Sequence, residues 1–382
     1  MLDGDHVLIT NTTGKIEAIL PAAEAGDDVQ RLKGVLSPGF VNCHCHLELS
    51  HMNGLIPEQT GLVDFVFKVV TERHLPDEAI AEAIVNAEKA MIAAGIVAVG
   101  DICNNLSTLG QKQKGNLAYY NFIEASGWAP ELAQTRFERS RDFYEAFESI
   151  QHIKYNPARA VQNSLSPHAP YSVSNKLWLL IQPYFPGKTI TIHNQETAFE
   201  DELFVSGSGD FTRMYEMMKL NTSFFQPTGK SSLRSYLPKM RDAKEIILVH
   251  NTFTKEEDIV FVNGEWSMVN WCICINANQY IENAVPPVDL LIKHGSSIVV
   301  GTDSLASNHT LSILDELKTI HQYFPSVPLA QLLQWATSNG AKALQLGDAL
   351  GNFEKGKSPG VVLIEGLENG NICSRSGSKK LI

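Results

Sequence analysis

The sequence predicts an α/β protein, a (β/α)8 TIM barrel joined to a small β-sandwich domain that both chain termini build. Three observations favour this fold. Eight short apolar runs alternate with long amphipathic segments. The two ends of the chain share a different texture of short strand-like runs. Metal-binding side chains end several of the apolar runs. We expect residues 1–36 and 353–382 to form the sandwich and residues 37–352 to form the barrel.

The terminal segments read as strands of one β unit. Residues 6–10 (HVLIT) and 15–20 (KIEAIL) flank the turn signal NTTG, and residues 361–366 (VVLIEG) have the same character. Neither end is long enough to bury a core by itself, so we expect the two ends to pack together. The chain begins close to its first recognisable strand, so the N-terminal part of this unit is expected to be shortened.

The barrel prediction depends on the regular alternation between the two ends. Helix signals separate the runs, as in residues 76–95, where Pro76 opens an amphipathic stretch and Gly95 follows it. Residues 312–324 and 328–346 are similar stretches. A doubly wound open sheet is the rival fold, but the sequence has neither a GxGxxG nor a Walker loop. The eight apolar runs are GFVNCHCH, IVAVGDIC, LAYYNFIEA, AVQNSLS, TITIHN, IILVHN, WCICINA and SIVVGTD.

Composition excludes several classes of function. The net charge of −11, without runs of Lys or Arg, disfavours nucleic acid and anionic membranes as partners. No apolar run approaches the roughly 18 residues that span a membrane, and the first residues do not resemble a signal peptide. Six cysteines in 382 residues do not suggest a disulfide scaffold. We therefore expect a cytoplasmic protein.

Titratable residues end four of the eight runs. His44 and His46 end the first run, His193 the fifth, His250 the sixth and Asp303 the eighth. A single histidine is commonly a core or surface residue, but the joint pattern is hard to produce by accident. The C-terminal strand ends carry the chemistry of a barrel, so we expect these five side chains to meet there.

The stretch VNCHCHLELSH (41–51) has the composition of a four-ligand zinc cluster. Strand side chains alternate, however, so His44 and His46 should enter the barrel while Cys43 and Cys45 face the helices. The C-x-C spacing of Cys43 and Cys45 also differs from the C-x2-C of zinc knuckles. A structural zinc site on these cysteines is therefore the weaker interpretation.

The histidines predict a catalytic metal instead. His193 and Asp303 can complete a shell begun by His44 and His46, a donor set suited to zinc, with ferrous iron as the alternative. A remaining coordination position of the metal would hold a water molecule, and the metal would lower the pKa of that water toward ~7.

Several motifs together resemble the amidohydrolase superfamily. They are LSPGFVNCHCHLE, TIHNQET, LVHN and GTDSLASNHTLSILDELK. The most similar branch contains S-adenosylhomocysteine/methylthioadenosine deaminases and triazine hydrolases, and HLELSH looks nearer to aminodeoxyfutalosine-type deaminases. The resemblance implies the metal ligands His44, His46, His193 and Asp303. It implies that Glu196 handles substrate protons, that His250 polarises the attacking water or the developing alkoxide, and that His168 contacts a nucleoside sugar.

The residues and the resemblance agree on a mononuclear metal-dependent aminohydrolase. Glu196, three residues beyond His193, can protonate a heteroaromatic ring nitrogen and then the departing ammonia, while Asp303 accepts the proton of water. Glu196 as a solvated loop acid is the alternative. The fourth run lacks the lysine that bridges two metals in binuclear relatives, which favours one metal. Other leaving groups, chloride from a triazine or the amine of an amide, stay open, as does a non-catalytic metal-binding barrel.

Further polar residues are candidates for binding the substrate, a small heteroaromatic amine. Glu48 lies two residues beyond His46 and is either a ligand for a ribose hydroxyl or a loop acid. Asn278 serves either substrate or a loop turn, and Ser304 follows Asp303. His168, beside Pro167, has a loop histidine as its alternative. The family resemblance also makes a homodimer an expectation.

Overall fold

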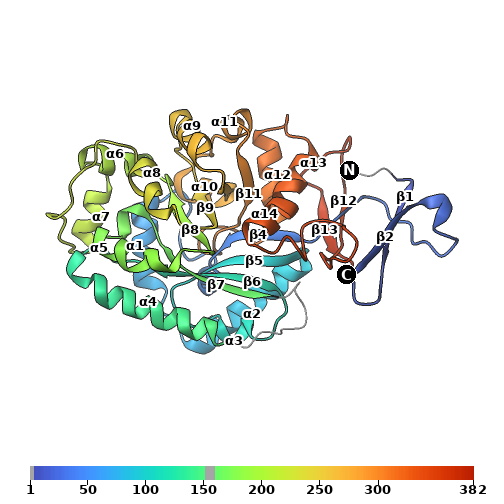
Figure 1. Ribbon diagram of the computed structural model, residues 1–382, viewed down its shortest axis with the longest axis horizontal. Coiled ribbons are helices and arrows are strands. Elements are labelled where there is room, and N and C mark those ends of the chain that lie inside the picture. The colour runs from blue at the N-terminus through green and yellow to red at the C-terminus, as the bar shows by residue number, and fades with distance from the viewer. Residues whose placement is uncertain (1–3, 151–159) are drawn as a thin grey trace.

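Parallel strands form the centre of the protein. The computed structural model describes residues 4–150 and 160–382. Within these residues, eight parallel strands form two four-stranded sheets, each in sequence order, and they match the eight predicted runs one for one (Figure 1). The first sheet contains β4 (Phe40–Cys45), β5 (Ile96–Cys103), β6 (Ala118–Ala125) and β7 (Val161–Pro167). The second contains β8 (Thr189–Asn194), β9 (Glu245–His250), β10 (Val269–Ile273) and β11 (Ser297–Val300).

Hydrogen bonds join the two sheets at both of their edges. The amides of Thr302 and Asp303, which follow β11, both donate to the carbonyl of His44 on β4 at 3.0 Å. On the other side, the amide of His193 on β8 donates to the carbonyl of His168, just beyond β7, at 3.0 Å. These bonds bring the C-terminal ends of β4, β8 and β11 together.

Helices follow the strands, as the amphipathic stretches predict. Residues 76–95 contain α2 (Asp77–Ala93), which begins after Pro76 and is followed by Gly95 in a left-handed conformation, φ 94°. Residues 328–346 form α13 (Leu329–Gln334), a π-helical turn (Trp335–Asn339) and α14 (Gly340–Ala343). The others are α1 (Leu62–Glu72), α3 (Leu109–Lys112), α4 (Ala133–Glu148), α5 (Asn175–Ile181), α6 (Ala198–Ser206), α7 (Phe211–Met217), α8 (Ser232–Tyr236), α9 (Glu256–Glu265), α10 (Ile275–Glu282), α11 (Val288–Lys293) and α12 (Ile313–Tyr323).

An apolar cluster lies between the two sheets and closes one end of the strands. It joins side chains from six strands with residues of α14 and the segment after it. All members are buried, so this end leaves little room for polar chemistry. Its members include Val41, Cys43, Ile102, Phe122, Val249, Cys272, Val299, Ala341 and Leu344.

The chain ends form small antiparallel sheets, as predicted. The hairpin β1 (His6–Thr10) and β2 (Ile16–Pro21) turns at Gly14, whose φ is 78°. A second sheet has the order β13 (Gly377–Lys380), β12 (Val362–Glu365) and β3 (Val35–Ser37), so it combines both ends of the chain. In Figure 1 the hairpin extends away from the main body beyond β12 and β13. Face-to-face packing as a sandwich stays a prediction, and residues 1–3 of that unit lie outside the described residues.

Membrane-spanning helices are absent from the described ranges. No helix within residues 4–150 and 160–382 combines the length and apolar character needed to cross a bilayer.

Candidate metal centre and active site

Four histidines and one aspartate converge at the C-terminal ends of the strands. The ring of His44 lies 4.9 Å from that of His46, 5.0 Å from that of His193 and 5.7 Å from that of His250, between centroids. The Oδ1 atom of Asp303 lies 3.4 Å from Nε2 of His44 and 3.3 Å from Nε2 of His46. The structure therefore brings together the five side chains that the sequence placed at strand ends.

The arrangement fits a metal ion. Two overlapping sets, His44 with His46 and Asp303, and His44 with His193 and His250, each offer three potential ligand atoms within 4.8 Å of one another. Among the described residues, neither ring nitrogen of the buried His44 has a hydrogen-bond partner, nor does Nδ1 of His46. Buried polar atoms without partners are costly, and a metal bound beside Asp303 would satisfy Nε2 of His44.

The protonation of the histidines also favours a metal. Burial lowers the pKa of His44 and His193, and it lowers that of His46 to about 3. These imidazoles are therefore neutral near pH 7, which is the form that binds metals. Nδ1 of His193 donates to the carbonyl of His168 at 2.8 Å, so its Nε2 keeps a free lone pair. The donor set of imidazoles and a carboxylate is typical of zinc or ferrous iron.

The cysteines do not share this centre, but one of them faces an unexpected direction. Cys43 packs in the apolar cluster between the sheets with Cys272, whereas Cys45 packs in the outer core with residues of the helices. The expectation that both cysteines face the helices is therefore wrong for Cys43. The pairing of β4 with β5 shifts register between Asn42 and Cys45, and this irregularity breaks the strict alternation.

Glu196 and His250 form a second pair beside the candidate ligands. Oε1 of Glu196 lies 3.6 Å from Nε2 of His250, and both side chains are buried. Burial, with the charge of Asp303, raises the pKa of Glu196 well above its usual range, which favours the protonated form of this acid. Nδ1 of His250 lies 2.8 Å from Oδ1 of Asn278, which accepts its proton and leaves Nε2 unprotonated toward Glu196.

The backbone is strained at these positions. His250 and Asp303 have φ values of 73° and 59°, in the left-handed region that non-glycine residues seldom adopt. Asn278 holds His250 from both sides, because its Nδ2 also donates to the carbonyl of His250 at 3.3 Å. Such strain persists only where surrounding contacts fix it, and it clusters at functional sites.

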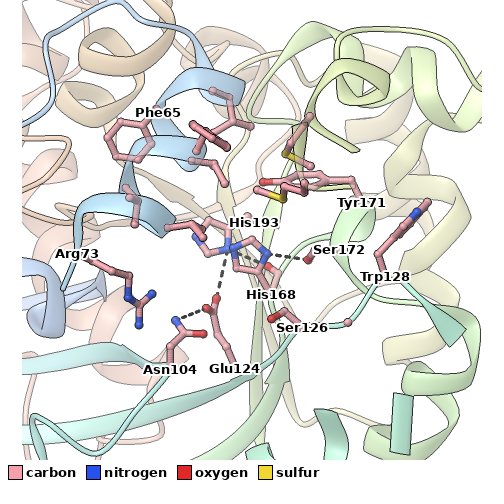
Figure 2. Close-up of a pocket in the computed structure, with 18 of the residues that line it drawn as sticks. Phe65, Arg73, Asn104, Glu124, Ser126, Trp128, His168, Tyr171, Ser172 and His193 are labelled. Carbon is pink, nitrogen blue, oxygen red and sulfur yellow. Dashed lines mark hydrogen bonds and ion pairs between the residues drawn. The ribbon is translucent and has the colours of Figure 1, made fainter. Parts of the chain in front are cut away.

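A cavity of about 720 Å³ opens above the centre. His46, His193, His250, Glu196 and Asp303 all contribute to its lining. Figure 2 shows Phe65, Tyr171 and Trp128 along its wall, with Arg73, Asn104 and Glu124 below them. A largely apolar cavity with a few convergent polar groups is the usual form of a small-molecule site.

Comparison with known proteins identifies the family of this chain. The model of the amidohydrolase family matches residues 35–378. This protein belongs to the amidohydrolase family. The 5-methylthioadenosine/S-adenosylhomocysteine deaminase of Thermococcus sibiricus is 25% identical over 96% of this chain and 82% of its own length.

Solved structures agree on the fold of this amidohydrolase. Helicobacter pylori aminofutalosine deaminase, in complex with methylthio-coformycin, superposes with a TM-score of 0.76 at 23% identity, covering 95% of this chain and 88% of that one. The atrazine chlorohydrolase of Arthrobacter aurescens, complexed with zinc, gives 0.73 at 15% identity, covering 97% and 86%. The resemblance to a branch with methylthioadenosine-type deaminases and triazine hydrolases is thus confirmed.

The four predicted substrate-binding residues divide into two pairs. His168 and Ser304 line the cavity. Glu48 and Asn278 are buried behind its described lining. Asn278 bonds His250, and Glu48 accepts a hydrogen bond from the amide of Asn104 at 2.9 Å. Burial raises the pKa of Glu48 to about 7, although nearby Arg73 opposes that rise. The contacts of Glu48 and Asn278 are therefore with the protein rather than with the cavity.

Sequence reasoning missed two acids at strand ends. Asp101, on β5, accepts the amide proton of Leu47 at 2.8 Å and pairs with Nζ of Lys112 at 2.5 Å, which fixes the turn after His46. Glu124, on β6, is buried and lines the cavity. Both acids stand near the ends of apolar runs, the same signal that identified His193 and Asp303.

Proposed function

We propose that this protein is a metal-dependent aminohydrolase that replaces an exocyclic amino group of a purine-type or other heteroaromatic substrate with oxygen and releases ammonia. The observation that carries this proposal is the buried Glu196–His250 pair, 3.6 Å apart, beside a cluster of neutral imidazoles and Asp303. The similarity to a deaminase of methylthioadenosine and S-adenosylhomocysteine supports the substrate class.

We assign one divalent metal, most simply zinc, to His44, His46, His193 and Asp303. When bound, the metal supplies hydroxide near neutral pH by lowering the pKa of water. Zinc in the related atrazine chlorohydrolase supports this choice over iron. A single metal is consistent with β7, whose residues Val161–Pro167 include no lysine.

Three side chains bind or transfer the protons of the reaction. Glu196, whose raised pKa favours its protonated form, donates its proton to the ring nitrogen next to the reacting carbon, which makes that carbon electrophilic. The unprotonated Nε2 of His250 accepts a hydrogen bond from the attacking water. Asp303 takes the proton that water loses. Glu196, now without its proton, takes up the hydroxyl proton of the addition product and delivers it to the amino group as ammonia leaves, and the proton held by Asp303 then restores Glu196. The sum is substrate amine plus water giving the oxo product plus ammonia.

The same comparisons support the finer description of the fold. We infer that the two four-stranded sheets close into the (β/α)8 barrel that membership of the family implies. In this view residues 37–352 are the catalytic barrel, and residues 1–36 with 353–382 are the terminal β unit. Both sets of hydrogen bonds between the sheets, at His44 and at His168, favour closure.

The test is an ammonia-release assay on zinc-loaded protein. The substrates are adenosine, methylthioadenosine, S-adenosylhomocysteine, aminodeoxyfutalosine, guanine and cytosine, with chelated protein as the control. We expect ammonia from at least one adenine nucleoside and none after chelation. Turnover of a chlorotriazine or an amide with no ammonia from any of these amines would overturn the deaminase assignment. Failure of every reaction would favour a non-catalytic metal-binding protein.

A further inference from the structure

We propose that Gln195, a buried residue outside the cavity, is a positioning residue that holds Glu196 against His250 for proton transfer. This proposal rests on the proposed function, because it assigns a further role in the same reaction. It starts from the short segment after β8, where Gln195 directly precedes the proton donor Glu196.

The carboxyl group of Glu196 is placed by its backbone. Among the described residues, no hydrogen bond holds this buried side chain, and its Oε1 lies 3.6 Å from Nε2 of His250. The backbone on both sides of this contact is strained, since the φ values of Gln195 and His250 are 43° and 73°. A displacement of about 1 Å at a reacting group can cost about 100-fold in rate. The segments that carry Glu196 and His250 therefore need contacts that hold them in place.

Two hydrogen bonds of Gln195 reach the segment that follows His250. The carbonyl of Gln195 accepts from the amide of Phe253 at 2.9 Å, and its Oε1 accepts from Oγ1 of Thr254 at 2.7 Å. The strands β8 and β9 end at Asn194 and His250, so these bonds continue the contact beyond both strands. Gln195 thus joins the two segments at the point where their catalytic side chains begin.

The other hydrogen bonds of Gln195 reach the helices that follow these segments. Its Nε2 donates to Oδ2 of Asp258 on α9 at 2.9 Å and to Oδ1 of Asp201 on α6 at 3.2 Å. Its backbone amide donates to Oε1 of Glu200 on α6 at 2.9 Å. Every donor and acceptor group of Gln195 therefore has a partner, and a fully satisfied buried network of this kind is rigid.

Gln195 acts through the protein rather than on the substrate. It is 1% exposed and does not belong to the described lining of the cavity, whereas Glu196 and His250 both do. A glutamine amide also has no proton to exchange with a substrate near neutral pH. An effect of Gln195 on the reaction must therefore pass through its neighbours. A purely structural role is the alternative, and the two roles differ in how a change at Gln195 combines with a change at Glu196.

The experiment is a double-mutant cycle between Gln195→Ala and Glu196→Gln on zinc-loaded protein. The measurements are kcat and KM for the nucleoside that the wild type deaminates fastest, with metal content and melting temperature. We expect Gln195→Ala to lower kcat about 10- to 100-fold and to change KM less than about 3-fold, because it misplaces a group that acts in the transition state. In the Glu196→Gln background the same substitution should lower kcat less than about 3-fold, because the group that it misplaces is already inactive.

A milder pair of variants covers the case in which Gln195→Ala folds poorly. Thr254→Val removes one hydrogen bond to Oε1 of Gln195 and should lower kcat about 2- to 10-fold, the cost of one hydrogen bond. Thr254→Ser keeps the hydroxyl group and should recover most of that loss. Asn270→Ala is the control. Asn270 is also a buried amide, and its Nδ2 donates to Glu245 at 2.9 Å, but it lies near the opposite end of the strands, at the start of β10. Its loss should lower the melting temperature and leave kcat unchanged.

Other outcomes would overturn the positioning role. Wild-type kcat in Gln195→Ala, or an equal fall in both backgrounds, would make Gln195 a structural residue. Loss of metal would place its effect at His193. If the wild type deaminates no substrate, the proposed function fails, and crystal structures of the wild type and Gln195→Ala then test the positioning. A longer separation between Glu196 and His250 in the variant would support it, and an unchanged separation would refute it.

Discussion

The two ends of the parallel strands differ in what they bury. The C-terminal ends bury imidazoles and carboxylates, several without partners, on backbone as strained as that of His250 and Asp303. The opposite end buries alanine, valine and leucine side chains beneath α14. Stability and chemistry are thus separated along the same strands, and β4 shows both, with Val41 in the apolar cluster and His46 in the cavity wall.

This difference teaches where substitutions act. A substitution at the polar end removes a metal ligand or a proton donor, and it can also remove a buried polar group that has no partner. A change at the apolar end alters only packing. Activity and stability should therefore respond separately to the two ends.

The largest expected effect is the loss of a metal ligand. His44→Ala removes the imidazole that belongs to both candidate ligand sets. We expect it to lose bound metal on dialysis and to lower ammonia release more than about 100-fold, beyond the usual cost of losing a partner outside the ligand shell. Metal is measured by mass spectrometry. His309→Ala is the matched control, because that side chain is 75% exposed, and it should keep both metal and activity.

The next effect separates proton transfer from metal binding. Glu196→Gln keeps the shape of the side chain but removes its transferable proton. We expect kcat to fall about 10²- to 10⁴-fold, the usual range for a general acid or base, with metal content unchanged. Glu202→Gln, an exposed acid of α6, is the control. Wild-type activity in Glu196→Gln would remove this residue from the mechanism.

The pH dependence of kcat tests the same acid. Because the pKa of Glu196 is raised, the group keeps its proton to a higher pH than an ordinary glutamic acid and loses it as the pH rises through that pKa. Since the protonated form is the donor, wild-type kcat should fall on the alkaline side. The residual activity of Glu196→Gln should not fall at alkaline pH. If kcat of the variant falls as that of the wild type does, another group is responsible for the alkaline decrease.

The sequence supplied most of this architecture because its signals are local. Apolar runs with helix signals between them identified all eight parallel strands, and the strand-end positions of His193 and Asp303 brought them to His44 and His46. The orientation of Cys43 was not predictable, since it depends on a register shift between β4 and β5. Glu124 ends an apolar run as His193 does, so the same signal could have identified it, whereas its unpaired oxygen is visible only in the three-dimensional contacts.

A smaller effect is expected where a residue acts through another. Asn278 bonds both the ring and the carbonyl of His250, so Asn278→Ala leaves that ring free to turn. We expect activity to fall about 10- to 100-fold, as for other partners that orient site residues, with metal retained. Asn278→Asp keeps an acceptor for Nδ1 and should recover part of the loss. Equal activity in both variants and the wild type would show that β9 alone holds His250.

The smallest effect on activity is expected at the apolar end. A Cβ atom at Gly340, at the start of α14, would lie 2.9 Å from Sγ of Cys43 and from Cβ of Val41. Gly340→Ala should therefore destabilise the fold by about 1–3 kcal/mol through overpacking, seen as a lower midpoint of denaturation. Gly264→Ala in α9 meets no atom within 4 Å and should instead gain about 0.5–1 kcal/mol from helix propensity. Both variants should keep wild-type kcat and metal content per folded molecule. A loss of metal in Gly340→Ala would mean that packing beneath α14 sets the geometry of His44 along β4, and the separation of the two ends would then fail.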